Sequence, residues 1–130
     1  MAAIRWITVQ TAQALYDYQI IEHGGSPGLR DLGLLESALA RPEHRHAYSG
    51  DDANPDIAAL AAAYAFGIAR NHCFIDGNKR AAMMVSFTFV EKNGWITFTD
   101  GMVDDLDAKG FKSAILTGGS GKSEAEESGD

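Results

Sequence analysis

The sequence contains few residues that would cross-link the chain or place it in a membrane. Its 130 residues include one cysteine, Cys73, which excludes an internal disulfide framework and is typical of a reducing compartment. The longest apolar run, residues 57–69, has 13 residues and is too short to span a bilayer. The first residues also lack the basic and apolar pattern of a signal peptide. We therefore predict a cytoplasmic protein that makes no membrane contact.

Positive charge is also scarce, with 11 Lys and Arg against 18 Asp and Glu and a formal net charge of −7. Residues 117–130 contain one Lys and four acidic residues, a net of −3, which leaves −4 on residues 1–116. This balance is unlike the basic surface that nucleic-acid binding requires, so no direct nucleic-acid partner is expected. The Gly/Ser/Glu-rich stretch 117–130 has no hydrophobic period and is predicted to be a disordered acidic tail after a single domain, residues 1–116.

Three motifs that suggest other functions fail in their context. Gly121-Lys122-Ser123 ends like a phosphate-binding Walker A loop, but the first required glycine falls on Leu116, and no strand precedes the motif. His44 and His46 are two residues apart, without the spacing of a zinc site. Cys73 has no sequence context of a cysteine protease.

The first part of the chain has a helical period. A helix is predicted from a cap at Thr8 to about His23, where a Gly-Gly pair follows. A short second helix, residues 32–40, should end before Pro42, because the residue before a proline disfavours the helical conformation. Residues 42–53 are polar and are predicted to form a loop.

The middle of the chain predicts two longer helices. The Asn-Pro-Asp triplet at residues 54–56 suggests a cap at Asn54, a proline in the first helical position and an acid in the first turn. The apolar spacing then predicts a helix that ends at residue 71 and delivers His72. Another helix, residues 79–92, is apolar on two sides and should be central and buried.

The C-terminal part of the folded domain gives weaker signals. A short strand is expected near residues 95–98, before an Asp-Gly turn. A last helix over residues 103–116 is weakened by Gly110. The chain is therefore expected to be mainly helical.

The most informative segment is residues 72–80, His-Cys-Phe-Ile-Asp-Gly-Asn-Lys-Arg. A glycine turn at a helix start leaves backbone N–H groups unpaired at the positive end of the helix dipole, which favours an anion. Lys79 and Arg80 add positive charge, and the planar fork of arginine suits phosphate oxygens. Asp76 suits Mg²⁺ bound to such a phosphate. His72 supplies an imidazole, the side chain most often used to accept a proton from an attacking hydroxyl.

This segment resembles the signature loop of the Fic/Doc superfamily, His-x-Phe-x-Asp-Gly-Asn followed by a cation pair. The general Fic loop continues Gly-Asn-Gly-Arg-x-x-Arg. This sequence has Lys79 in place of the second Gly of that motif and Met83 in place of the second Arg. Both differences are similar to the Doc branch, the death-on-curing toxins, whose loop ends in Asn-Lys-Arg. The resemblance covers roughly residues 5–100, and it includes residues 24–38.

The resemblance implies an all-α fold, a compact Fic/Doc-like helical bundle with a small β flap. It also implies the toxin of a type II toxin–antitoxin pair in the bacterial cytoplasm, acting as a protein kinase. Such a kinase uses ATP and Mg²⁺ and transfers the γ-phosphate to a threonine of elongation factor Tu, which blocks translation. The implied partner is a cognate, Phd-like antitoxin whose partly disordered tail covers the cleft.

The resemblance also assigns roles to residues of this sequence. The implied catalytic residues are His72 as general base, Asp76 as Mg²⁺ ligand, Lys79 and Arg80. The implied nucleotide-binding residues are Gly77, Asn78, Lys79 and Arg80. The implied flap that aligns the target protein is Ser26, Pro27, Gly28, Leu29 and Arg30.

Two alternatives remain open from the sequence. The first is a Fic-type adenylyltransferase, which would use the same residues to transfer AMP to a protein hydroxyl. Lys79 favours the kinase, because its side chain would crowd the usual polyphosphate site and offer charge to the terminal phosphate. The second is a degenerate Fic-like domain that only binds a partner.

Overall fold

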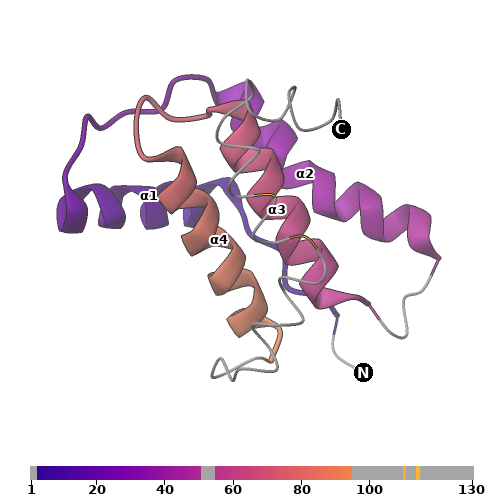
Figure 1. The fold of residues 1–130 in the computed structure, drawn as a ribbon. Coiled ribbons are helices and arrows are strands. Elements are labelled where there is room, and N and C mark those ends of the chain that lie inside the picture. Colours follow the sequence, from indigo (N-terminus) through magenta and orange to yellow (C-terminus); the bar gives the residue numbers. More distant parts are fainter. Residues whose placement is uncertain (1–2, 51–54, 95–109, 111–113, 115–130) are drawn as a thin grey trace.

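Over the residues that the structure describes, the chain forms four helices, which bring the segment 72–80 to one end of the bundle (Figure 1). The computed structural model describes residues 3–50, 55–94, 110 and 114. The helices are α1 (Val9–His23), α2 (Leu32–Ser49), α3 (Ile57–Asn71) and α4 (Asn78–Lys92). No strand occurs among these residues. The all-α prediction is therefore confirmed over the part of the chain that the structure describes.

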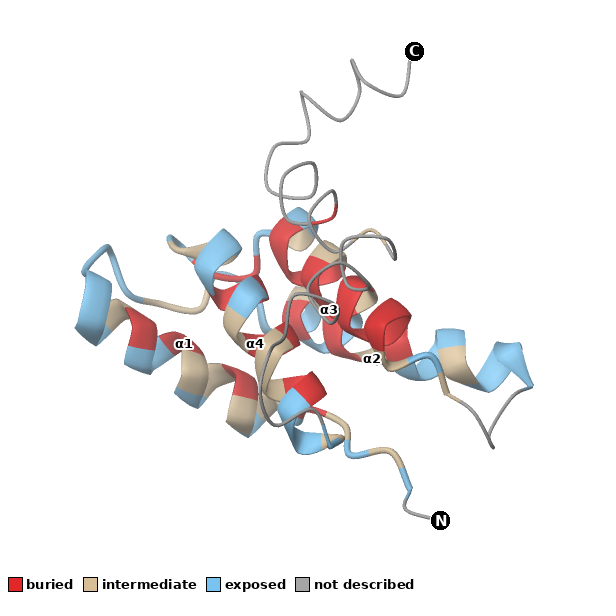
Figure 2. Cartoon of the chain, turned by 60° about the horizontal axis from the view of Figure 1, so that its bottom comes forward, coloured by how far each residue is buried: buried red, intermediate tan, exposed pale blue. Residues whose placement is uncertain are grey.

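Helix α3 forms the centre of the packing. Ten of its 15 residues are buried, and it packs against α2 on one side and α4 on the other, while α1 packs against α4 (Figures 1 and 2). The buried Ser86 hydroxyl of α4 lies 2.7 Å from the Ala82 carbonyl of its own helix and 3.1 Å from the Ala61 carbonyl of α3, so its proton is shared between the two helices. On α4, Val85 and Phe89 are buried, whereas Met83 is 39% exposed. The central helix is thus α3 rather than α4.

The predicted first helix is confirmed, with its cap. The Thr8 side chain accepts a hydrogen bond from the Thr11 N–H at 3.1 Å, which satisfies one of the free donors of the first turn. The helix ends at Gly24, whose φ of 81° is readily adopted by glycine.

The predicted end of the second helix before Pro42 is wrong, because α2 continues through a buried Pro42 to Ser49. The helix and not a loop therefore occupies residues 42–49. Pro42 cannot donate to the carbonyl of Ala38, four residues earlier. That carbonyl faces α3 at Gly67, where an added Cβ would lie 3.4 Å from the oxygen and 3.3 Å from the Ala38 Cα. Close packing of the two helices thus stabilises a helix that the local preference would end.

The cap of α3 also differs from the prediction. Asp56, not Asn54, is the N-cap, and its side chain accepts from the Ala59 N–H at 3.0 Å. Pro55 therefore precedes the cap and does not occupy the first helical position. The C-terminal end is as predicted: α3 stops at Asn71 and delivers His72.

The remaining predictions on the fold have different outcomes. The predicted β flap, residues 26–30, contains one isolated antiparallel bridge, between Leu29 and Phe74, and no strand. The predicted strand at 95–98 and the tail 117–130 lie outside the described residues, as does the helix 103–116 except for residues 110 and 114. No helix in the described ranges is long and apolar enough to cross a membrane.

Candidate active site

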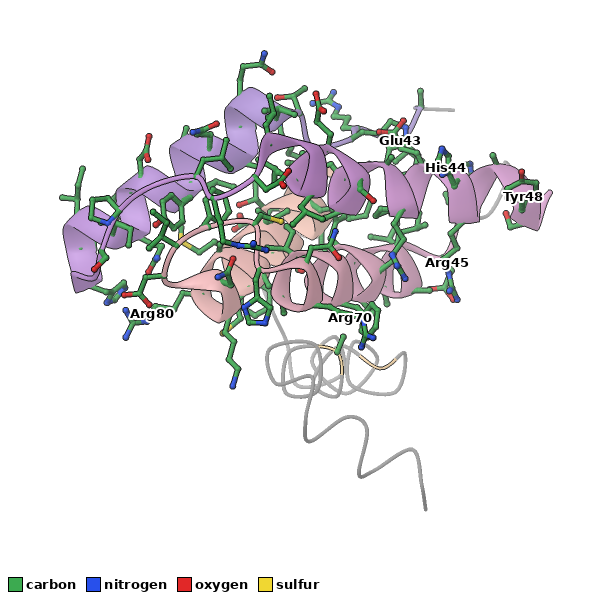
Figure 3. All side chains as sticks on the ribbon, turned by 90° about the horizontal axis from the view of Figure 1, so that it is seen from above. Glu43, His44, Arg45, Tyr48, Arg70 and Arg80 are labelled. Carbon is green, nitrogen blue, oxygen red and sulfur yellow. The ribbon has the colours of Figure 1, made fainter. Side chains whose placement is uncertain are left out.

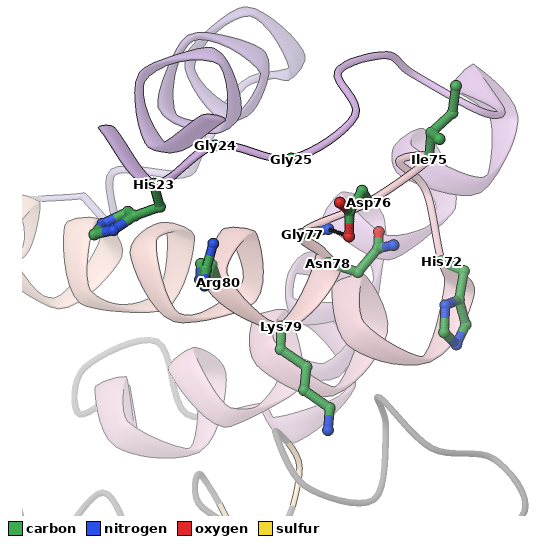
Figure 4. Close-up of a pocket in the computed structure, with 10 residues that line it drawn as sticks. All are labelled: His23, Gly24, Gly25, His72, Ile75, Asp76, Gly77, Asn78, Lys79 and Arg80. Atoms are coloured by element: carbon green, nitrogen blue, oxygen red, sulfur yellow. Dashed lines mark hydrogen bonds between the residues drawn. The ribbon is translucent and has the colours of Figure 1, made fainter. Parts of the chain in front are cut away.

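The segment between α3 and α4 lines a pocket of about 590 Å³ (Figure 4). The pocket brings together all six residues that the sequence assigned to catalysis and nucleotide binding, with four others. Its lining residues are His23, Gly24, Gly25, His72, Ile75, Asp76, Gly77, Asn78, Lys79 and Arg80.

His72 is exposed and is the C-cap of α3. Its φ of 50° and ψ of 55° are left-handed, which costs a residue other than glycine about 1–2 kcal/mol. The guanidinium of Arg30 binds the end of this helix: Nε donates to the His72 carbonyl at 2.7 Å and Nη2 donates to the Asn71 carbonyl at 2.9 Å. A cation here opposes the negative end of the helix dipole.

Asp76 joins the loop to the start of the flap. One carboxylate oxygen accepts from the Gly77 N–H at 2.8 Å, and the other accepts from the Ser26 N–H at 3.2 Å. A Cβ on Gly25 would lie 2.8 Å from the second oxygen. The carboxylate therefore needs glycine at position 25 for this approach.

The Asn78 side chain holds the shape of the loop. Its Oδ1 accepts from the Phe74 N–H at 2.9 Å, and its Nδ2 donates to the Phe74 carbonyl at 2.9 Å. The same amide was predicted to bind phosphate through its side chain. In this structure it satisfies both backbone groups of Phe74 and so fixes the turn.

Gly77 starts α4 in a left-handed conformation, with φ of 77° and ψ of 23° and no side-chain cap. The first N–H groups of α4 are thus left without a side-chain acceptor at the end of the helix that favours an anion. Behind the turn lies Gln19 of α1, whose side-chain amide is fully buried and has no hydrogen-bond partner among the described residues. A Cβ on Gly77 would collide with the Gln19 Nε2.

The charged side chains occupy different parts of the pocket. Figure 4 shows His72 at one side, Arg80 beside His23 at the other, and Lys79 between them at the edge. Lys79 and Arg80 are both exposed. An elongated polyanion that lies across the start of α4 would therefore meet cations along its length and reach His72 at one end.

Two residues of the loop, Cys73 and Phe74, are buried. Burial raises the pKa of the Cys73 thiol to about 11, so the thiol is protonated and unsuited to nucleophilic attack. Phe74 stacks on Tyr16 of α1, with ring centroids 3.8 Å apart and an interplanar angle of 5°. The Tyr16 hydroxyl donates to the Ser26 carbonyl at 3.3 Å, and burial raises the pKa of this phenol.

The predicted target flap lies beside this loop. Besides the Leu29–Phe74 bridge, the Ile75 N–H donates to the Gly28 carbonyl at 2.9 Å. Ser26 and Pro27 are exposed, which leaves them available to a partner. The Arg30 side chain instead binds α3, as described above.

The described residues contain no group of three or more His, Cys, Asp or Glu side chains that could hold a metal ion. Within these residues, Asp76 has no protein partners for an all-protein metal site. One carboxylate together with phosphate oxygens is nevertheless the usual way in which Mg²⁺ binds a nucleotide site, so this residue fits a metal that arrives with the nucleotide.

Five residues at the pocket were not assigned to the site from the sequence: His23, Gly24, Gly25 and Ile75 line it, and Gln19 lies behind the turn. His23 was treated as a helix-end residue without a role, and it lines the pocket with Gly24. Gln19 was not singled out, because a polar residue on a helix carries no sign of its burial. Gln19 and His23 are four residues apart, which places both on one side of α1. This spacing is the only sign in the sequence that Gln19 lies near the pocket.

A protein-family profile and two known proteins are similar to this chain. The sequence profile of the Fic/DOC family matches residues 6–90. The chain is 43% identical over 117 residues to a protein named Toxin Doc from Mycolicibacterium smegmatis, covering 75% of this chain and 88% of that relative. It is 34% identical over 103 residues to a protein named Protein kinase doc from Escherichia phage P1, covering 79% of each.

Proposed function

The chain belongs to the Fic/DOC family, and from this premise we propose that it is a toxin kinase. It transfers the γ-phosphate of ATP to a threonine hydroxyl of a protein substrate, elongation factor Tu, and so blocks translation in the bacterial cytoplasm. The names of the two relatives, a toxin and a protein kinase, support this proposal. Lys79 favours γ-transfer over adenylylation, because its side chain would crowd the usual polyphosphate site and offer charge to the terminal phosphate.

The observation that carries the proposal is the arrangement around the start of α4. A base, a carboxylate and two cations line one pocket with the uncapped N-terminus of the helix (Figure 4). Phosphoryl transfer depends mainly on positioning and on electrostatic stabilisation of the phosphoryl oxygens. The pocket offers backbone N–H groups and fixed positive charge for that purpose.

The reaction follows from these positions. His72 accepts the proton of the threonine hydroxyl, and the hydroxyl oxygen forms a bond to the γ-phosphorus while the bond from that phosphorus to the bridging oxygen of ADP breaks. Lys79, Arg80 and the first N–H groups of α4 stabilise the negative charge on the phosphates. Asp76 would hold Mg²⁺, which neutralises phosphate charge when it is bound. Asn78 and Gly77 keep the turn open for the phosphates.

The partners follow from the same proposal. Ser26 and Pro27 are exposed beside the pocket and would align the target segment, with the neighbouring Gly28 and Leu29. A cognate antitoxin would restrain the enzyme by covering this region. The exposed apolar side chain of Ile75 in the loop, 59% accessible, suits such a cover.

The experiment uses the purified chain, elongation factor Tu and Mg-ATP labelled in turn at the γ- and α-phosphates. We expect γ-label on the target, ADP as the second product, and no transfer when a chelator removes Mg²⁺. Transfer of the α-label with release of pyrophosphate would replace the kinase by an adenylyltransferase. Transfer of neither label to any protein hydroxyl would reduce the chain to a binding domain.

A further inference from the structure

The backbone around His72 is held by the last residue of the flap, Arg30, and by the next residue, Asp31. Arg30 donates from its side chain to the carbonyls of Asn71 and His72. The backbone N–H groups of Arg30 and Asp31 both donate to the Cys73 carbonyl, at 2.7 and 3.2 Å. Three successive carbonyls, those of residues 71–73, therefore accept hydrogen bonds from two adjacent residues.

This support acts on the most strained residue of the loop. Among the described residues, His72 is the only one other than glycine with a positive φ. Such a conformation persists only where the surrounding structure imposes it. No hydrogen bond to the His72 imidazole is found in the described part of the chain, so its direction depends on the backbone that carries it.

We propose that Arg30 is a positioning residue for His72. Its guanidinium binds the last two carbonyls of α3 and so fixes the left-handed turn that places the imidazole at the pocket. The inference depends on the proposed function, in which His72 is the general base. A guanidinium suits this position because it offers two donors in one plane and places positive charge at the C-terminal end of a helix. Arg30 therefore acts on the enzyme's own base and not on the target protein.

Steady-state kinetics distinguishes a role of Arg30 in positioning His72 from a role in binding the target protein. If Arg30 positions His72, Arg30→Ala should lower kcat by about 100-fold, since a small displacement of a catalytic group has this effect. The KM values for ATP and for elongation factor Tu should stay unchanged. Arg30→Lys should lose most of the same activity, because an ammonium cannot make both bonds in the geometry of the fork. A rise in the KM for the target with unchanged kcat would show a target contact and overturn the inference.

Chemical rescue gives a sharper result. Arg30 is exposed, so guanidinium ion at a concentration well below denaturing should reach the vacated position. It should raise the kcat of Arg30→Ala and leave His72→Ala unchanged. The control is Arg45→Ala, which removes the same charge from the outer end of α2, far from Arg80 and the pocket (Figure 3), and should keep the parent kcat.

A measurement without substrate keeps the inference separate from the proposed function. In NMR spectra, Arg30→Ala should shift the backbone and ring signals of His72, whereas Arg45→Ala should not. If Arg30→Ala does not fold, Arg30→Lys supplies both measurements. Unchanged His72 signals together with parent-like kcat would refute the role of Arg30. Absence of transfer by the parent itself, with the His72 signals shifted in the variant, would refute the kinase and leave the support of His72 by Arg30 intact.

Discussion

Replacing Gly77 by alanine should destabilise the protein more than its backbone conformation alone requires. The left-handed φ of 77° costs an alanine about 1–2 kcal/mol. In addition, the new Cβ would collide with the Gln19 amide, which is fully buried, so the amide would have to shift within packed surroundings. Forcing such a contact in a packed interior costs about 1–3 kcal/mol. We therefore expect a loss of about 2–5 kcal/mol in the free energy of unfolding.

A matched control isolates the contact. Gly50 has a similar φ of 72°, and no described atom lies within 4 Å of its added Cβ. Gly50→Ala should therefore cost only the backbone term, about 1–2 kcal/mol. Both changes also reduce the entropy of the unfolded chain in the same way, so this effect cancels in the comparison.

Urea unfolding followed by circular dichroism measures both costs and their dependence on Gln19. In a Gln19→Ala background, the cost of Gly77→Ala should fall towards that of Gly50→Ala, with a coupling energy of about 1–3 kcal/mol. Equal midpoints for Gly77→Ala and Gly50→Ala in the parent background would show that the Gln19 contact has no energetic weight. Additive costs in the double variant would lead to the same conclusion.

Five further outcomes are expected. His72→Ala should lower transfer by about 10²–10⁴-fold at an unchanged urea midpoint, and retained toxicity on expression would contradict its role. Arg80→Lys should lower kcat/KM about 10-fold or more in the labelled-ATP assay, and Lys79→Gly should depress γ-transfer. Burial raises the pKa of Tyr64 to about 12 from 10.0. The contribution of the neutral phenol to stability is thus complete below pH 10. Between pH 10 and 12 the free energy of unfolding from urea titrations should fall by about 1.4 kcal/mol per pH unit, and this fall should be absent in Tyr64→Phe. The protonated, buried Cys73 thiol should resist maleimide in the folded protein at pH 8, as mass spectrometry would show.

The sequence predicted the elements whose signals are local. Thr8 is a good cap and lies before an apolar period, so α1 was placed at both ends. Residues 72–80 are contiguous, so their convergence on one pocket required only that a turn join two helices. The helical character of most of the chain followed from the apolar spacing.

Predictions that depend on contacts between distant residues were less accurate. The helix through Pro42 requires Gly67 on another helix to approach Ala38, and no local rule contains that contact. Likewise, Arg30 was assigned to the target protein because nothing in the sequence indicates that its side chain reaches residues 71 and 72, more than 40 positions later.

The hydrogen bonds from Asn78 to both backbone groups of Phe74 have a consequence for control of the protein. Together with the Asp76 contacts, they brace the loop entirely from within the chain. A loop braced in this way is already formed without a ligand, so we expect a partner to control the site by covering it and not by reshaping it. A restraining partner would then act by stoichiometry: the effect on the cell would depend on how many copies exceed the supply of that partner. The response to a shortage of partner would accordingly have a threshold and would rise steeply beyond it.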